Sequence, residues 1–272
     1  MQRPGAYRWV RLHDWRWLSA LSVAVLVAYL ALTPVVEASD AMDYYLLDLS
    51  DPYANPWGAL HAFVYSPAYA QVLYPLTVLP FEAFHKVLMA INLGALVFLL
   101  GPVWAVVALP LAHSDISNGQ VHLPLAASIV LMLRSPGWAA FGLLSKVTPG
   151  VTVLWFVGRR EWRSLAIALG VTAGIIGVSA VLWPEAWGEW LALLSESSTR
   201  HVSNFSVSQW PVIFRLPIAA GLVVMAAWRG RPAALPVIAC FALPTIWAGS
   251  LVMLLAVPRL WVMGSDRATA HS

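Results

Sequence analysis

The sequence predicts an all-α protein that crosses a membrane several times. Of its 272 residues, 60% are hydrophobic and only 11% are charged, and the mean hydropathy is +0.73. Soluble domains are about 45–50% apolar and about 25% charged. Apolar runs recur along the chain, and several approach the ~20 residues that a helix needs to cross a bilayer. These observations exclude a soluble globular core, a disordered chain and a nucleic-acid-binding domain.

The distribution of charge predicts which loops face the cytoplasm. Residues 1–17 are rich in arginine, and the apolar run 18–36 that follows is longer than the about 7–15 residues of a secretory signal core. We therefore interpret this run as a membrane anchor behind a cytoplasmic tail, because arginine and lysine concentrate on the cytoplasmic side. Residues 37–80 contain five acidic and no basic residues. This segment is predicted to be an outer loop.

The later arginines and the intervening apolar runs define the remaining spans of a single membrane domain, residues 1–272. We expect about seven to ten spans in all, with some helices short or broken where Pro and Gly interrupt apolar runs. A second outer loop is expected at 183–210 and a C-terminal tail at 259–272. The expected spans are 18–36, 84–100, 102–117, 119–133, 137–157, 164–182, 211–228 and 234–258.

Two of these runs have an unusual charge pattern. Residues 137–157 and 234–258 carry arginine on both sides, so each is expected to form a hairpin that turns near its proline. Most of the 15 tryptophans lie near the ends of expected spans, where amphipathic rings anchor helices at the headgroup level. Trp247 differs because it follows the break at Pro244, where it could line a cavity.

The acidic outer loop contains the residues that best suit a reaction with a sugar. Asp40 follows the first span closely, and partial burial there would raise its pKa toward that of a general base. A solvated loop acid or a helix N-cap is the alternative role for Asp40. Nearby aromatic rings could pack on sugar C–H surfaces while carboxylates accept hydroxyl hydrogen bonds. The sugar-binding candidates in this loop are Asp43, Tyr44, Tyr45 and Tyr65.

Basic side chains in or beside apolar runs are candidates for binding a phosphate. Lys146 lies within the run 137–157, and an ionisable group at membrane depth is a functional hypothesis by default. The alternative is that its long stem snorkels to the interface. Arg200, His201 and Arg215 are further candidates, with lipid headgroup contact as the alternative for the first two.

Several short motifs, taken in order, resemble the polytopic mannosyltransferases of glycosyltransferase family 87, the DUF2029 group of the GT-C superfamily. Each motif is weak alone, and the resemblance rests on their order between residue 37 and about residue 258. The motifs are Asp40 after the first span, Asp51-Pro52-Tyr53, Tyr65-Ser66-Pro67, Asn118-Gly119-Gln120, Lys146-Val147-Thr148-Pro149, the Arg159–Arg163 cluster, Asn204-Phe205-Ser206 with Arg215, and Pro244-Thr245-Ile246-Trp247. His122 departs from the pattern, because the family usually has Asn at this position.

The resemblance implies a GT-C-like fold and an inverting hexosyltransferase. The resemblance implies that the hexose is mannose and that it passes from a polyprenyl-phosphate donor to a lipid-linked or envelope glycan acceptor on the outer face of a bacterial-type plasma membrane. Asp40 would be the catalytic base, and Lys146 would bind the donor phosphate together with Arg200, His201 and Arg215. Asn118, Gln120, His122, Asn204 and Trp247 would join the outer-loop residues in binding sugar or acceptor.

No cofactor and no required metal are expected, because no His, Asp or Glu spacing matches a metal site. The membrane lipids surround the protein, and nucleic acid is not a partner. The strongest alternative function is a transporter or flippase for a lipid-linked sugar, since broken helices and an intramembrane lysine are also typical of transporters. Against it, the two halves show no repeat, and the acids gather in one loop rather than along a midplane path.

Overall fold

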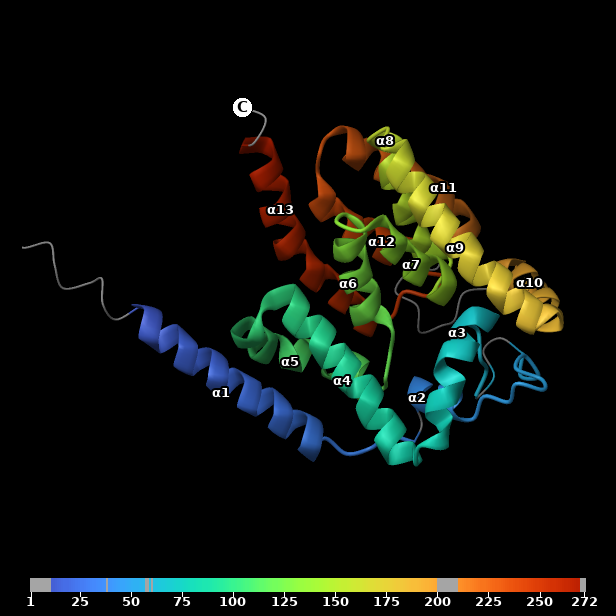
Figure 1. The fold of residues 1–272 in the computed structure, drawn as a ribbon, viewed down its shortest axis with the longest axis horizontal. Coiled ribbons are helices and arrows are strands. Elements are labelled where there is room, and N and C mark those ends of the chain that lie inside the picture. The colour runs from blue at the N-terminus through green and yellow to red at the C-terminus, as the bar shows by residue number, and fades with distance from the viewer. Residues whose placement is uncertain (1–10, 38, 57–58, 60, 200–209, 270–272) are drawn as a thin grey trace, which may run out of the picture.

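The computed structural model describes residues 11–37, 39–56, 59, 61–199 and 210–269, and within these ranges it is helical and contains no β-strand (Figure 1). The α-helices are α1 (Arg11–Leu32), α2 (Asp40–Tyr45), α3 (Pro67–Leu73), α4 (Phe81–Leu100), α5 (Pro102–Ser117), α6 (His122–Met132), α7 (Ala139–Ser145), α8 (Leu154–Gly158), α9 (Trp162–Leu182), α10 (Pro184–Thr199), α11 (Val212–Trp228), α12 (Leu235–Ala242) and α13 (Val257–Thr269). Short 3₁₀ helices connect some of them: η1 (Tyr74–Val78), η2 (Pro136–Trp138), η3 (Thr148–Val153), η4 (Pro232–Ala234) and η5 (Gly249–Ala256).

Three helices within the described residues are long and apolar enough to cross a membrane. These are Trp15–Leu32 of α1, Phe81–Leu100 of α4 and Trp162–Leu182 of α9. α1 and α9 expose most of their apolar side chains, whereas α4 is half-covered by its neighbours. A helix that is apolar on all sides yet exposed is suited to contact with lipid. The polytopic all-α class expected from the sequence is therefore confirmed.

The first helix ends earlier than the expected span 18–36. α1 stops at Leu32, because Pro34 has no N–H to continue the ladder and restricts the residue before it. The ammonium of Lys86 on α4 then donates to the carbonyls of Leu30 and Thr33, at 2.7 and 2.5 Å. This contact satisfies carbonyls at the C-terminus of α1 and ties α1 to α4.

The two runs expected as hairpins are indeed broken near their prolines. Residues 137–157 form α7, an extended residue at Lys146, then η3 and α8, and α7 packs against η3. Residues 234–258 form α12, an irregular turn around Pro244, and then η5, which packs back on α12. Gly150 makes the first return possible, because a Cβ there would lie 2.5 Å from the Leu143 side chain.

The expected outer loop is folded rather than extended. Its described residues 39–56 and 61–80, here called the aromatic cap, contain α2, α3 and η1. Tyr44, Phe63 and Tyr65 form their own buried cluster with Phe84 and Leu88 of α4. In Figure 1, α2 and α3 lie at the lower right, next to the start of α4 and to α10. A larger apolar core joins α4, α5, α6, α11 and α12.

Gly119 allows the aromatic cap to dock closely on the membrane bundle. It has φ +68°, in the left-handed region that favours glycine, and a Cβ there would meet the Ala41 Cβ at 2.9 Å. The backbone N–H of Ala41 donates to the Asn118 carbonyl at 3.0 Å. This junction places Asp40, the residue before Ala41, beside the turn between α5 and α6.

Candidate active site

Asp40 is a half-buried carboxyl at the start of α2. Among the described residues its side chain has no hydrogen-bond partner apart from its own backbone. Burial raises the pKa of Asp40 to about 6, although the positive charge of Lys146 opposes this rise, and the carboxylates of Asp43 and Asp115 add to it. A carboxylate with such a pKa is ionised at neutral pH and basic enough to accept a proton.

Lys146 lies at the break between α7 and η3, with an extended backbone. Its Nζ is 3.1 Å from His122 Nε2 and 5.9 Å from the centre of the Tyr65 ring. In the described part of the chain, its ammonium has no other hydrogen-bond acceptor, and it forms no ion pair within 4.0 Å. It is nevertheless close enough to Asp40 to interact with it electrostatically. A cation and a carboxylate thus share one site without neutralising each other by direct contact.

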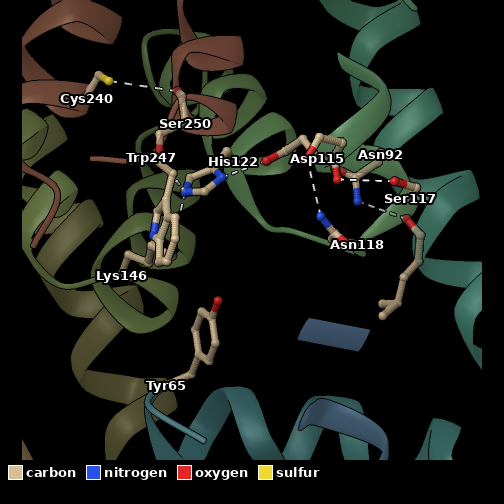
Figure 2. Close-up of polar contacts among 12 residues, drawn as sticks. Tyr65, Asn92, Asp115, Ser117, Asn118, His122, Lys146, Cys240, Trp247 and Ser250 are labelled. Atoms are coloured by element: carbon tan, nitrogen blue, oxygen red, sulfur yellow. Dashed lines mark hydrogen bonds and ion pairs between the residues drawn. The ribbon is translucent and has the colours of Figure 1, made fainter. Parts of the chain in front are cut away.

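His122, at the first position of α6, connects Lys146 to a buried acid. Its Nδ1 is 2.7 Å from Asp115 Oδ1 on α5, and both residues are 1% exposed. Ser250 Oγ on η5 lies 3.3 Å from the same Nε2 that Lys146 contacts, and accepts the backbone N–H of Trp247 at 3.2 Å. Figure 2 shows these side chains above Tyr65, whose hydroxyl points toward them. The expected residues His122, Lys146, Tyr65 and Trp247 are therefore brought together.

The aromatic residues of the cap have two different placements. Tyr65 lies below Lys146, while the Tyr44 hydroxyl donates to the Tyr65 hydroxyl at 2.8 Å and Tyr44 is 1% exposed. Tyr45 packs against Phe81 and Phe84. This geometry gives Tyr44 a supporting position behind Tyr65 and makes Tyr45 part of the packing against the start of α4.

The polar residues of the α5–α6 turn also differ in what they offer. The side-chain amide of Asn118 donates a hydrogen bond to Ser114 Oγ at 3.3 Å, and its backbone carbonyl accepts one from the N–H of Ala41 in α2. Gln120 Oε1 is buried without a partner among the described residues. Asp43 is paired with His61, at 2.9 Å between Oδ1 and Nδ1. Gln120 is thus the residue of this group with an unused acceptor.

Arg215 is placed differently from the other phosphate candidates. It is 0% exposed, and its guanidinium donates to the carbonyls of Trp210, Phe241, Leu243 and Pro244 at 2.5–2.8 Å. These bonds hold the break after α12, so the geometry favours a structural role over phosphate binding. The remaining candidates Arg200, His201 and Asn204 lie outside the described residues.

An apolar groove lies next to this polar site. It has a volume of about 360 Å³ and is lined by side chains of α3, α7 and α9 together with the segment before α7. Tyr69 on its wall stacks near Tyr65, with ring centres 5.0 Å apart, and Leu144 in the groove is close in sequence to Lys146. An amphiphile could place an anionic group at Lys146 and a hydrocarbon chain in the groove.

Sequence reasoning missed Asp115 and Ser250. Asp115 lies in the apolar run 102–117, as Lys146 lies in 137–157, and the rule for intramembrane charges could have identified it. Ser250 has no comparable signal, because its part in the site depends on how η5 folds back. Among the described residues, no three His, Cys, Asp or Glu side chains are grouped as metal ligands.

Comparison with known proteins places the chain among membrane sugar transferases. The sequence model of glycosyltransferase family 87 matches residues 63–271, which begins after Asp40 and Asp43. A polyprenol-phosphate-mannose-dependent alpha-(1-2)-phosphatidylinositol pentamannoside mannosyltransferase of Mycolicibacterium smegmatis is 28% identical over 164 residues, 50% of this chain and 38% of that protein. Its namesake in Mycobacterium tuberculosis is 27% identical over 146 residues, 44% of this chain and 34% of that protein. No solved structure matches the chain. The match spans well under half of the length of these relatives.

Proposed function

Because the chain belongs to glycosyltransferase family 87, we propose that it is a membrane enzyme that transfers a mannosyl group from a polyprenyl-phosphate donor to a glycolipid or glycan acceptor. The transfer takes place on the outer face and inverts the configuration at the sugar C1 carbon. The names of the two relatives support a polyprenyl-phosphate-linked mannose as donor.

The observation that carries this proposal is the separation of Asp40 and Lys146 within one half-buried site. Inverting transfer needs a base on one side of the sugar and stabilisation of the leaving phosphate on the other. Asp40 accepts the proton of the acceptor hydroxyl while its oxygen forms the new bond to C1. The bond from C1 to the phosphate oxygen breaks, and Lys146 stabilises the negative charge that the departing polyprenyl phosphate gains.

The residues around Asp40 and Lys146 support this placement of the donor and the acceptor. The apolar groove beside Tyr69 offers a place for the first isoprene units of the donor. Trp247 offers an exposed indole to the sugar, whereas Tyr65 and the Oε1 atom of Gln120 are buried and remain predicted sugar contacts. Arg200, His201 and Asn204 remain predicted contacts to the donor or acceptor.

A transfer assay tests the proposed function. Purified protein in lipid nanodiscs is given polyprenyl-phosphate mannose and a mannosylated phosphatidylinositol acceptor, and the product is analysed by mass spectrometry and NMR. We expect an added mannose with the anomeric configuration opposite to that of the donor. Movement of the donor across proteoliposome membranes without any new glycosidic bond would instead establish the transporter alternative.

The outer-face location gives a labelling prediction. Cys240 is the only cysteine and is 5% exposed, so the natural chain has a low labelling background. We expect a cysteine introduced at the exposed position Ala54 of the cap to react with a membrane-impermeant maleimide in intact cells. Labelling only after the cytoplasmic face is opened would show that the orientation is wrong.

The raised pKa of Asp40 gives a pH prediction. A base must be deprotonated to act, so kcat/KM should be constant above pH 7 and fall about tenfold per pH unit once the pH is below about 6. The rate is measured between pH 4.5 and 8 with donor limiting. If the fall of kcat/KM at low pH keeps the same midpoint in Asp40→Glu, the group that titrates is not Asp40.

A further inference from the structure

We propose that Asp115 is a positioning residue that sets the tautomer of His122, and that His122 in turn aims the Lys146 ammonium at the donor phosphate. This inference rests on the proposed function and adds a residue that acts behind the groups in contact with substrate. Asp115 itself touches neither Lys146 nor the open part of the site.

The contacts form a chain from the bundle interior to the site. Asp115 on α5 and His122 on α6 lie 2.7 Å apart, and both are buried. The opposite ring nitrogen of His122 is 3.1 Å from Lys146 Nζ (Figure 2). An acid, an imidazole and an ammonium thus form a chain of contacts, and the ammonium at its end lies over the Tyr65 ring and close enough to Asp40 to interact with it electrostatically.

These contacts are compatible with one protonation state of the imidazole. A carboxylate accepts hydrogen bonds and an ammonium only donates them. His122 therefore carries its proton on Nδ1, donates it to Asp115, and accepts on Nε2. With a proton on Nε2, the ring could no longer accept from Lys146 and would repel it. Ser250 Oγ, which accepts the N–H of Trp247, lies 3.3 Å from the same Nε2, and its hydroxyl would share the single Nε2 lone pair with Lys146.

Lys146 needs such a tether because its own backbone does not fix its side chain. It stands between α7 and η3 as a single extended residue, on a stem with four rotatable bonds. One of its three hydrogens is directed to His122, and the other two have no acceptor in the described part of the chain. These two hydrogens are available to a phosphate.

Packing alone does not account for Asp115. Its second carboxylate oxygen, Oδ2, is buried without a hydrogen-bond partner among the described residues. A buried acceptor without a partner destabilises the folded state, and an apolar residue at this position would avoid that cost. The carboxylate is explained if its negative charge is needed to orient His122 and to balance the charge of Lys146.

A double-mutant cycle tests whether Asp115 acts through Lys146. We expect Asp115→Asn to lower kcat/KM for the donor about 10- to 100-fold, the range typical for removal of an outer-shell partner. In the Lys146→Met background the same change should have an effect of less than about threefold, because the residue that it orients is gone. Glu82→Gln, which changes an exposed carboxyl on α4 in the same way, is the matched control and should be silent in both backgrounds.

Binding and NMR give readouts that do not depend on catalysis. The natural chain, Asp115→Asn, Lys146→Met and the double variant are titrated with polyprenyl phosphate in nanodiscs, and ¹⁵N signals of labelled histidine are recorded, with His122→Gln used for assignment. We expect an Nδ1-protonated His122 in the natural chain and a loss of this signal pattern in Asp115→Asn. The signal of His61, which is paired with Asp43 at the surface, should not change.

The outcomes separate this inference from the proposed function. Equal losses on Asp115→Asn in both backgrounds, or an Nε2-protonated His122 in the natural chain, would overturn the positioning role and leave the transferase intact. A chain that binds polyprenyl phosphate through the coupled pair but transfers no sugar would overturn the proposed function alone.

Discussion

Asp40→Asn should abolish most of the transfer activity while the donor still binds. Asn is nearly isosteric with Asp but cannot accept a proton, and a positioned general base contributes about 10²- to 10⁴-fold to the rate. Asp40 forms no side-chain hydrogen bond with another described residue, so its replacement leaves the fold intact. Single-turnover rates and the dissociation constant for polyprenyl phosphate, measured on the same preparation, separate the loss of chemistry from a loss of binding.

Asp43→Asn provides the comparison for this experiment. Asp43 lies one helical turn further along α2, where its carboxyl pairs with His61. We expect a much smaller loss, because that carboxyl is engaged away from Lys146. If Asp43 proves essential and Asp40 dispensable, the base has been assigned one turn too early. If neither change matters, a transporter or an assembly subunit becomes the better interpretation.

Lys146→Met should raise the donor KM and also lower kcat. Methionine keeps most of the apolar stem but removes the charge that is proposed to face the donor phosphate. Removal of one preorganised donor to a developing negative charge typically lowers kcat about 10²- to 10³-fold. Steady-state kinetics with donor varied at saturating acceptor give both constants. Unchanged constants in a folded variant would show that Lys146 only snorkels to the interface.

Lys86→Met is the natural control, because Lys86 is the only other lysine. Its ammonium binds carbonyls at the end of α1 rather than facing the site. Its loss should lower the thermal unfolding temperature and leave the donor KM unchanged. The two lysine variants should therefore differ in which quantity they change.

The sequence predicted the parts of the site that depend on charge in an apolar setting. Lys146 was identified because a charge within an apolar run is a functional hypothesis by default, and Asp40 because it follows the first span closely and takes the place of the catalytic Asp in the resemblance to family 87. The same rule could not distinguish Arg215, since a guanidinium that binds backbone carbonyls and one that awaits a phosphate look alike in sequence. Which of these two roles Arg215 has depends on where α12 ends relative to α11, and this is set by tertiary packing.

Local features of the sequence explain which helix boundaries were predicted correctly and which were not. The end of α1 was placed too late because hydropathy continues through Pro34 to Val36, whereas backbone hydrogen bonding stops at the proline. The breaks in 137–157 and 234–258 were expected because proline and flanking arginines lie in the sequence itself. The compact aromatic cap was not expected, since its core depends on contacts between Tyr44, Tyr65 and Phe84.

The guanidinium of Arg215 provides the hydrogen-bond donors that the irregular backbone beside the site lacks. Where α12 stops at Ala242, carbonyl oxygens lose their helical partners, and each would cost several kcal/mol if it were buried without a hydrogen bond. The planar group, with five hydrogens arranged as a fork, donates to three such oxygens and to the carbonyl of Trp210 before α11. A lysine carries the same charge but has only three hydrogens to donate. Arg215→Lys would therefore leave at least one of these carbonyls without a hydrogen bond. One side chain thereby provides hydrogen bonds for the non-helical segment that brings Trp247 and Ser250 to His122.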